Sequence, residues 1–580
     1  MDSGGEGRAQ FLVHQCAKTA AEVGLQNPPA NLCCIYHLIE GMTQVSMQEN
    51  VEVASSSIKE LKDTLWKAAD KLRGSMDASQ YKDVILGLVF LKYVSDAFTE
   101  RRIQLREELS DAGMTEDQIA LLIDNVDEYT GHGVFWVPDQ ARWEYLAANA
   151  KGLPALDGQE PKSIGELINI AMDEIMDANQ TLAGTLPRIF NRDSVDQRRL
   201  GELIDLFNTT RFTGQGPGRA RDLLGEVYEY FLEKFARAEG KRGGEFYTPA
   251  DVVRVLVEVL EPMSGRVYDP CCGSGGMFVQ TEKFLDAHHQ DRTAISVYGQ
   301  EQNERTWRMA KMNLAIHGLN ANLAPRWGDT FARDQHPDLQ ADYILANPPF
   351  NIKDWTRNEA DPRWRYGVPP KNNANYAWIQ HILSKLAPGG SAGVVMANGS
   401  MSSNTGGEGG IRAGLVEADL VSCMVVLPTQ LFRSTGIPVC VWFFAKDKTA
   451  GDQGSIDRTG QVLFIDARNL GYMIDRAERA LSDEDIAKIA ETFHAWRGTP
   501  SAEGQPYEDE AGFCYSATLE EIKDADYTLT PGRYVGAAEV EDDGEPIDEK
   551  IARLKQELYA QFDESARLAE VVREQLARVS

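Results

Sequence analysis

Short apolar segments alternate with helical stretches between about residues 265 and 445, and this alternation limits the possible folds more than any other feature. Helical spacing is clearest in 277–287, 304–317 and 376–386, each of which separates two apolar segments of strand length. Such alternation predicts a doubly wound α/β fold with a largely parallel sheet. No helical stretch separates the last two segments, so we expect an antiparallel pair at the edge of a seven-stranded sheet. The expected strands are Arg266–Asp269, Ile295–Gln300, Pro325–Gly328, Tyr343–Ala346, Ala392–Ala397, Val421–Leu427 and Val439–Phe444.

The fourth strand ends at Asn347-Pro348-Pro349-Phe350. Because proline cannot donate to a strand ladder, the backbone should leave the sheet there as a rigid, extended turn. The Asn347 side-chain oxygen and the Pro348 carbonyl can then accept both hydrogens of an exocyclic amine, while Phe350 stacks on a planar base. A plain strand-ending turn is the alternative. We prefer that alternative for Asn27–Ala30 (NPPA), which has neither a preceding strand nor an aromatic residue.

Acidic residues stand at the ends of the three preceding strands. Asp269 opens the stretch DPCCGSGGM, and Glu301 and Asp329 end the next two strands. The glycines let the backbone approach a ligand closely at a helix N-terminus, but their spacing is not the G-x-G-x-x-G of nicotinamide and flavin enzymes. An acid at Glu301 can accept both ribose hydroxyls of an adenosine, and Asp329 is placed for the adenine. Each acid alone is more often a helix cap or a solvated residue; the series of three favours a nucleoside site.

Two neighbouring features bear on the chemistry. Pro270-Cys271 matches the nucleophile pair of cytosine C5 methylases, but it follows the first strand and not the strand before Asn347, so we interpret Cys271 and Cys272 as packing residues. Without a nucleophile beside Asn347, direct attack by an exocyclic amine on a methyl group is favoured. The segment 351–375 interleaves aromatic and basic residues, which favours contact with bases and phosphates over a loop that only caps the sheet. These residues are Trp355, Trp364 and Tyr366 with Lys353, Arg357, Arg363, Arg365 and Lys371.

The rest of the chain divides by its periodicity. Residues 47–215 show helical spacing and should form an all-helical domain, in which 84–94 is apolar nearly all round, as in a buried helix. The α/β domain should cover 216–535, and residues 536–580 should hold an acidic linker and an amphipathic helix that binds a partner. Residues 1–46 look atypical, and we interpret them as an extension from a misplaced start codon. The apolar stripe of the last helix is Ile551, Leu554, Leu558, Phe562, Val572, Leu576 and Val579.

Composition excludes several classes of protein. No apolar run reaches membrane-spanning length and no leader opens the chain, so we expect a soluble, cytoplasmic protein. The eight cysteines have neither disulfide-framework nor zinc spacing, and we expect no metal site. There is no phosphate-binding G-x-x-x-x-G-K-[ST] loop. The net charge of −29 is unusual for a protein that holds DNA alone, so the substrate is not nucleic acid or another subunit shares the contact.

Taken in order, these segments resemble the modification (DNA methyltransferase) subunit of type I restriction-modification systems. The resemblance covers most of 57–535 and rests on YKDVILGLVFLKYVSDAF, GGEFYTP, DPCCGSGGMF, ANPPF, TGIPVCVWFF and LTPGRYV. Seven strands that close with an antiparallel pair are also the layout of S-adenosylmethionine-dependent methyltransferases, which have a Rossmann-like fold. The resemblance implies N6-adenine methylation of DNA with S-adenosylmethionine, and it does not cover residues 1–46.

The same resemblance implies the site residues and the partners. The target adenine, flipped out of double-stranded DNA, would lie at Asn347, Pro348, Pro349 and Phe350. A specificity subunit would read the sequence, a second copy of this chain would join the complex, and a restriction subunit would join for cleavage. A methyltransferase acting on an RNA base or a protein glutamine, and a scaffold without catalysis, are the alternatives. The cofactor contacts would be Glu245, Phe246, Tyr247, Thr248, Pro249, Asp269, Ser274, Gly275, Gly276, Glu301 and Asp329.

Overall fold

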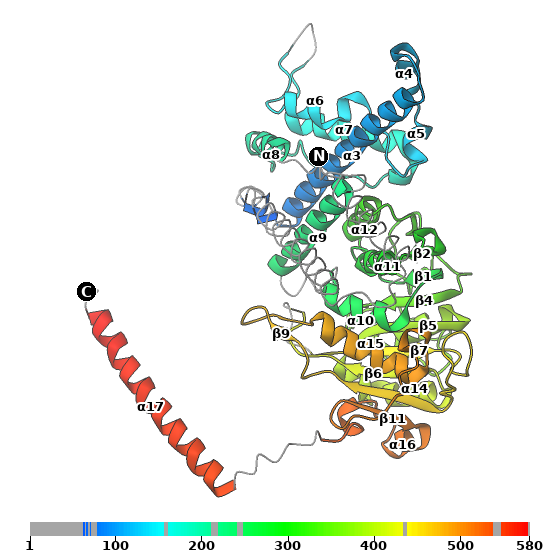
Figure 1. The fold of residues 1–580 in the computed structure, drawn as a ribbon, viewed down its shortest axis with the longest axis vertical. Helices are drawn as coiled ribbons and strands as arrows, with labels where there is room; N and C mark the ends of the chain where they lie inside the picture. The colour runs from blue at the N-terminus through cyan, green and yellow to red at the C-terminus, as the bar shows by residue number, and fades with distance from the viewer. Residues whose placement is uncertain are drawn as a thin grey trace, which may run out of the picture. The chain divides into compact units, whose positions relative to one another are not determined.

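The computed structural model describes residues 62–63, 65–67, 70, 78–155, 160–209, 219–239, 247–432, 438–537 and 547–577 (Figure 1). The predicted extension at 1–46 lies outside these residues, as do Glu245 and Phe246. Most of the described chain falls into two compact units. The first unit lies within 1–253, 262–339 and 432–435, and the second lies within 254–261, 340–431 and 436–580.

The first unit begins with the helical region that the sequence predicts. Its longest helix, α3 (Ala78–Asp111), carries the apolar segment 84–94, and the hydrophobic side chains of that segment are all buried, which confirms the expected buried helix. A capping box starts α7: the Ser163 hydroxyl accepts from the Glu166 amide, and the Glu166 carboxylate accepts from the Ser163 amide. The other helices of this region are α4 (Glu116–Leu122), α5 (Asp127–Thr130), η1 (Asp139–Ala141), α6 (Trp143–Ala148), α7 (Ile164–Ala178), η2 (Gln180–Leu182), α8 (Gln197–Thr209) and α9 (Arg219–Glu239).

Three parallel strands complete the first unit, with β2 paired to β1 on one side and to β3 on the other. The helix α12 belongs to two layers, because its Met309, Met312 and Ile316 are part of the core of the helical region. The elements here are β1 (Gly265–Asp269), α11 (Gly276–Ala287), η4 (Arg292–Ala294), β2 (Ile295–Gly299), α12 (Glu304–Ile316) and β3 (Ala321–Asn322). The predicted strand at Pro325–Gly328 is wrong. The strand is the two-residue β3 instead, and Ala324 with its positive φ of 62° turns the chain before Pro325.

The second unit holds six strands in the order β11-β8-β6-β7-β5-β4. Strands β4 and β5 are parallel, as are β6 and β8, whereas β7 is antiparallel to both β5 and β6, and β11 is antiparallel to β8. The predicted antiparallel pair of β6 and β7 is confirmed, but its place at the edge is wrong, because β8 and β11 extend the sheet beyond β6. Together with β1, β2 and β3 these strands number nine, two more than predicted. The strands are β4 (Ala341–Ala346), β5 (Leu386–Ala397), β6 (Val421–Val426), β7 (Val439–Ala445), β8 (Gln461–Asp466) and β11 (Cys514–Thr518), with a separate pair β9 (Tyr472–Met473) and β10 (Arg479–Ala480).

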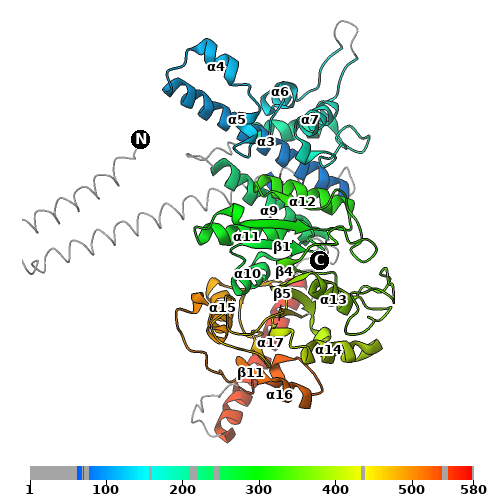
Figure 2. The same cartoon turned by 90° about the vertical axis from the view of Figure 1, so that its right-hand side faces the viewer.

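Helices cover both faces of the strands in the second unit, with α15 on one side and α13 and α14 on the other (Figure 2). Adjacent residues of β7 show the alternation. The Trp442 ring meets Tyr376 of α13 edge-on at 6.2 Å, and the Phe443 ring lies 6.1 Å from Phe493 of α15. The helices are α10 (Ala250–Leu260), α13 (Asn375–Lys385), η5 (Asn398–Met401), η6 (Thr405–Gly407), α14 (Glu408–Glu417), α15 (Asp483–Arg497), η7 (Pro500–Ala502), α16 (Leu519–Asp524), η8 (Pro531–Arg533) and α17 (Ile547–Ala577).

The last helix, α17, exposes apolar side chains along its length. Ile551, Leu558, Phe562 and Val572 are each between 44% and 59% exposed. The predicted stripe also includes Leu554, Leu576 and Val579. The structure does not describe the side chains of these three residues. None of the described helices is long and apolar enough to cross a membrane.

Candidate functional site

The first predicted acid, Asp269, is the last residue of β1 and is 2% exposed. One of its oxygens accepts a hydrogen bond from the Cys271 amide at 2.9 Å, which holds the start of the glycine-rich loop. Burial raises the pKa of Asp269 to about 7, and the hydrogen bond from the Cys271 amide only partly opposes it. A buried carboxyl with a raised pKa at a strand end is a candidate for a ligand-binding group.

The loop after Asp269 is tied to β2 and opens at the start of α11. The Cys272 amide donates to the Gln300 carbonyl at 3.0 Å, and Gly275 adopts a positive φ of 83°, a conformation that favours glycine. From α12, the Asn313 side chain donates to the Ser274 carbonyl at 3.0 Å. At Gly276 an added Cβ would meet nothing within 4 Å, so the backbone at the N-terminus of α11 faces open space. This is the geometry in which a ligand can approach the main chain closely.

Glu301 follows β2, is 9% exposed, and is joined to the same loop. One carboxylate oxygen accepts from the Gly273 amide at 3.1 Å and the other from the Asn303 amide at 2.7 Å. Burial raises the pKa of Glu301 to about 7, although these amide bonds oppose the rise. The Gln302 amide also hydrogen-bonds to this carboxylate. Because a carboxylate has about four acceptor positions, it can still accept a hydroxyl of a ligand. The structure therefore brings Glu301 and the glycine-rich loop together.

Asp329 lies on a segment that the loop and β2 hold in place. Its carboxylate accepts from the Phe331 amide at 2.8 Å, and the neighbouring Thr330 hydroxyl donates to the Pro270 carbonyl at 2.7 Å. The Gly328 amide donates to the Glu301 carbonyl at 2.8 Å. Asp269, the glycine-rich loop, Glu301 and Asp329 thus form one hydrogen-bonded edge at the carboxyl ends of β1 and β2, which we call the strand-end cluster.

Gln300 is a residue of this cluster that the sequence analysis missed. Its side chain is fully buried and hydrogen-bonds to backbone of the segment around Asp329. The amide nitrogen donates to the carbonyls of Gly328 at 3.0 Å and Arg333 at 2.9 Å, and the oxygen accepts from the Gln335 amide at 3.1 Å. A glutamine between an apolar strand and an acid gives no periodic signal, so only the fold reveals this role.

The predicted contacts ahead of α10 lie beside the same loop. Tyr247 and Thr248 line a cavity of about 200 Å³ together with Gly276, the first residue of α11. The Pro249 carbonyl accepts from the Val253 amide at 3.1 Å and so begins α10. Three of the five residues predicted in 245–249 are described, and two of them reach the loop.

In the second unit, β4 ends at Ala346 and Asn347-Pro348-Pro349-Phe350 leaves the strand without regular structure, as predicted. Pro348 is buried, whereas Asn347, Pro349 and Phe350 are half-buried. A reciprocal amide pair fixes the turn that follows. The Asn351 amide donates to the Asn375 side chain at 2.9 Å, and the Asn375 side chain donates to the Asn351 side chain at 3.0 Å. Asn375, 3% exposed at the start of α13, is a second supporting residue that the sequence analysis missed.

The segment after this turn uses much of its aromatic and basic content internally. The Trp355 indole donates to the Pro370 carbonyl and the Trp364 indole to the Asn358 carbonyl, and the two rings meet edge-on at 5.8 Å. Arg357 donates to the Pro369 carbonyl at 2.9 Å, and Arg363 pairs with Asp361. The exposed cations are Lys353, Arg365 and Lys371. Trp355 and Trp364 therefore stabilise the conformation of the loop, whereas the side chains of these three cations lie in solvent.

The structure also bears on a thiol nucleophile and on a metal. Burial and the neighbouring carboxylates hold the thiol pKa values of Cys271 and Cys272 well above their usual range, so neither is a ready thiolate. Cys272 is buried, with its sulfur 3.3 Å from where a Cβ on Gly299 would lie, which confirms it as a packing residue. Among the described residues, no three or more His, Cys, Asp or Glu side chains are arranged to hold a metal ion.

The fold and the strand-end cluster define the class of protein: a mixed α/β protein with a mostly parallel sheet and a helical N-terminal region. A crystal structure of the methyltransferase subunit of a type I restriction-modification system from Streptococcus thermophilus shares this fold, with a TM-score of 0.66 and 24% identity, covering 82% of this chain and 99% of that one. The family model described as N-6 DNA Methylase matches residues 219–543, and the one described as HsdM N-terminal domain matches 61–207.

Two relatives extend the match. The chain is 48% identical over 451 residues to the type I restriction enzyme HindI methylase subunit of Haemophilus influenzae, which is 76% of this chain and 99% of the relative. It is 38% identical over 530 residues to the MjaIX methylase subunit of Methanocaldococcus jannaschii, 89% of this chain and 90% of the relative. The chain belongs to the N-6 DNA methylase family, as a methylase subunit of the type I restriction enzymes.

Proposed function

We propose that this chain is the adenine-specific DNA methyltransferase of a type I restriction-modification system, with S-adenosylmethionine as methyl donor and the N6 amine of a DNA adenine as acceptor. The observation that carries the proposal is the strand-end cluster, in which Asp269, Glu301 and Asp329 are joined through the glycine-rich loop. Membership of the N-6 DNA methylase family supports the choice of reaction. The cluster supports the choice of donor, because it contains the groups that an adenosine-containing donor needs.

The residues of the first unit suit such a donor. Glu301 would accept both ribose hydroxyls, as an acid at the end of this strand can. Asp329 would accept from the adenine amine. Asp269, Ser274, Gly275, Gly276 and the 245–249 segment would hold the amino-acid end, where the backbone at Gly276 is open. When bound, the donor supplies a methyl group on a sulfonium centre.

The residues of the second unit suit the acceptor. Asn347 Oδ1 and the Pro348 carbonyl would accept the two N–H groups of a flipped adenine, and Phe350 would stack on the ring. These acceptors favour a tetrahedral amine nitrogen, whose lone pair is then free to attack. Pro349 keeps the turn rigid. Direct attack is the simplest chemistry, because the thiols of Cys271 and Cys272 are held protonated.

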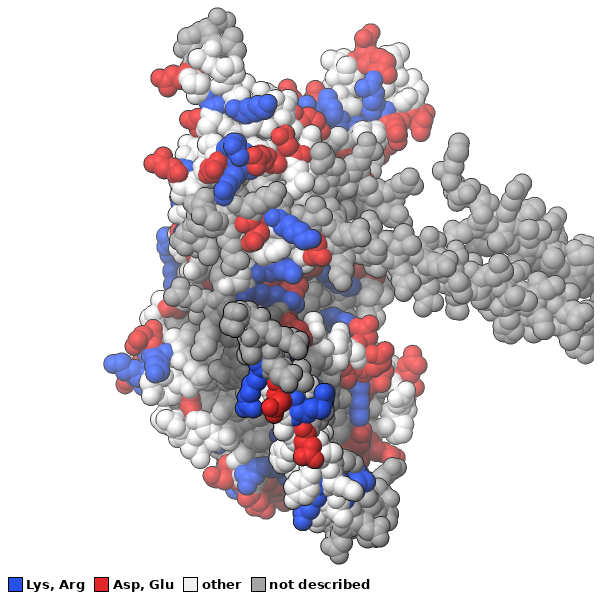
Figure 3. Space-filling view, turned by 90° about the vertical axis from the view of Figure 1, so that its left-hand side faces the viewer, with Lys and Arg blue, Asp and Glu red and all other residues white. Residues whose placement is uncertain are grey.

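The partners of the complex follow from the family and from charge. With a net charge of −29, this chain would share the DNA contact with a specificity subunit, and Lys353, Arg365 and Lys371 would add a few phosphate contacts. On the face in Figure 3, basic and acidic side chains are interspersed over the described surface, unlike the basic stripe of a protein that binds DNA unaided. The exposed apolar residues of α17 would pack against a helix of a partner subunit. The complex would contain one specificity subunit, a second copy of this chain and a restriction subunit.

The test is single-molecule sequencing of DNA from cells that carry this gene with its neighbours, compared with the same cells carrying Asn347→Ala. We expect N6-methyladenine at a split, two-part motif, lost in the variant. Asn351→Ala is the matched control, since it alters an asparagine four residues away that only supports the turn; it should reduce methylation without abolishing it. An unmodified genome in cells whose purified subunit binds the cofactor would favour another acceptor, an RNA base or a protein glutamine, or a scaffold.

A further inference from the structure

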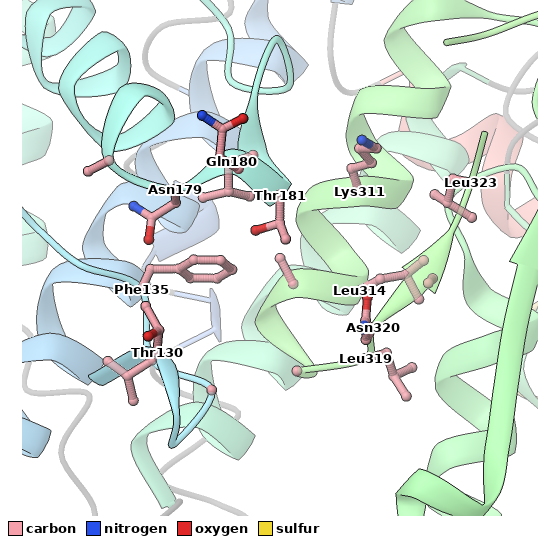
Figure 4. Close-up of a pocket in the computed structure, with 17 residues that line it drawn as sticks. Thr130, Phe135, Asn179, Gln180, Thr181, Lys311, Leu314, Leu319, Asn320 and Leu323 are labelled. Carbon is pink, nitrogen blue, oxygen red and sulfur yellow. The ribbon is translucent and has the colours of Figure 1, made fainter. Parts of the chain in front are cut away.

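A second cavity of the first unit, of about 520 Å³, lies between α12 and the helical region. One wall comes from α12 and the segment after it, with Lys311, Leu314, Leu319, Asn320 and Leu323 (Figure 4). The opposite wall comes from the helical region, with Thr130, Phe135, Asn179, Gln180 and Thr181 (Figure 4). Its volume is typical of sites for small organic ligands, and its lining is mostly apolar with a few polar groups, as such sites are.

The described lining of the cavity includes one positively charged side chain, Lys311. Lys311 is half-buried on the α12 wall, and its ammonium group lies 4.5 Å from the centre of the Trp307 ring. Among the described side chains, no carboxylate forms an ion pair with Lys311. The pKa of Lys311 is lowered because burial disfavours the ammonium ion. A half-buried cation in an apolar wall is stabilised by an anion that enters the cavity, and the lining suits an anion with an apolar body.

The cavity shares its wall with the strand-end cluster. A Cβ on Gly275 would lie 3.3 Å from the Leu314 side chain, so Leu314 packs directly on the glycine-rich loop. A Cβ on Gly299 would lie 2.7 Å from the Leu323 side chain, so Leu323 packs on the end of β2, two residues before Glu301. A ligand that contacts Leu314 and Leu323 therefore touches the back of the two elements that position the proposed cofactor contacts.

We propose that this cavity is an effector site for a small organic anion with an apolar body, bound through Lys311 and sensed at the glycine-rich loop. The site itself is independent of the proposed reaction, and only its coupling rests on the proposed function. Because coupling between two sites is reciprocal, the anion and the cofactor must change each other's affinity by the same factor.

The test uses the purified full-length chain and 8-anilinonaphthalene-1-sulfonate as the probe, with its fluorescence titrated in the absence of DNA. We expect one saturable site. Lys311→Met keeps the apolar stem and removes the charge, and it should weaken the probe at least about tenfold, the value of a charge-assisted contact. Thr181→Trp adds bulk to an exposed position of the opposite wall and should block the probe without disturbing the core. Lys151→Met removes an exposed lysine elsewhere in the same unit and should change nothing.

The coupling is read by titrating S-adenosylhomocysteine with and without saturating probe. We expect the dissociation constant of S-adenosylhomocysteine to change, and Lys311→Met to remove the change. The proposal is overturned if the wild type shows no saturable probe site, if Lys311→Met binds the probe as the wild type does, or if the probe leaves the affinity for S-adenosylhomocysteine unchanged. Failure of the proposed function would look different, because S-adenosylhomocysteine would then not bind even without the probe.

Discussion

Cofactor binding should depend on pH through Glu301, and Glu301→Gln should remove that share of the dependence. The folded-state pKa of Glu301 is about 7, against an ordinary value of 4.5, because the carboxyl is buried. Ribose hydroxyls donate to a carboxylate more favourably than to a carboxylic acid, so the cofactor should select the ionised form. Affinity should therefore rise with pH up to about 7 and level off above it.

The magnitude follows from the population of the ionised form. One pH unit below a pKa of about 7, roughly a tenth of the Glu301 carboxyls are ionised, so the apparent dissociation constant at pH 6 should be about tenfold weaker than its limit at high pH. The pKa of Asp269 is also raised to about 7, so its protonation would weaken the apparent affinity at pH 6 by as much as a similar factor. Glu301→Gln keeps the shape of the side chain but not its proton equilibrium. The variant should bind more weakly at pH 8 and lose about one factor of ten from the pH dependence.

Stability should change with pH in the opposite direction. Below pH 4.5 Glu301 is protonated in the folded and unfolded chain alike. Between 4.5 and about 7 the folded chain keeps a proton that the unfolded chain has lost, so stability falls as the pH rises. The rise from 4.5 to about 7 corresponds to about 3 kcal/mol for this carboxyl, which the wild type without cofactor loses over that range.

Isothermal titration calorimetry with S-adenosylhomocysteine between pH 6 and pH 8 measures these effects. Repeating each titration in buffers of different ionisation enthalpy gives the number of protons released. We expect net proton release near pH 7 from the wild type and less from Glu301→Gln. If the variant keeps the full pH dependence and the full proton release of the wild type, Glu301 does not bind the cofactor as an ionised carboxylate, and our reasoning about its role is refuted.

Three further predictions concern the supporting residues and the last helix. Gln300→Leu removes the hydrogen-bond partner of the Gly328 and Arg333 carbonyls and of the Gln335 amide. It should weaken cofactor affinity at least about tenfold, as measured by calorimetry, while the melting temperature of the cofactor-free chain changes little. Asn375→Ala removes the pair with Asn351 and should lower kcat about tenfold in a radioactive methyl-transfer assay, with cofactor affinity unchanged; an equal loss of both would mean general unfolding. Deletion of 549–580 should abolish co-purification with the specificity subunit while calorimetry shows normal cofactor binding; unchanged assembly would assign α17 to the chain's own core.

The sequence predicts the strands best where burial produces a continuous apolar run. β6 and β7, which are buried at every position, overlap their predicted positions closely. β1, β2 and β4 also overlap theirs. β3 pairs only two residues, too few to leave a pattern in the sequence, and the predicted strand at Pro325–Gly328 lay a few residues too late. β8, although its Val462–Ile465 run is apolar, follows a region without strand and helix alternation, and β11 is polar on one face.

The residues of the candidate site also fall into those that the sequence predicts and those that only the fold reveals. Acids and glycines at strand ends are visible in the sequence because position along the chain predicts position in the sheet. Gln300 and Asn375 are not visible in this way, since each acts by pairing with backbone or amide groups that only the fold brings within 3 Å or so. In the aromatic and basic loop, the fold shows contacts that composition does not reveal, since the Trp355 and Trp364 indoles donate to backbone carbonyls of the loop. The contact of this loop with bases and phosphates stays a prediction.

The helix α12 contacts both the helical region and the glycine-rich loop, and this limits how the protein can be cut into separate domains. α12 supplies Met309, Met312 and Ile316 to the core of the helical region, and it also supports the glycine-rich loop through Asn313 and Leu314. Removing the helical region would expose those three side chains to water and loosen the element on which the loop rests. The methyltransferase part should therefore fold poorly when it is expressed without the helical region. A chimaera of two relatives should fold well only when its helical region and its α12 come from the same parent.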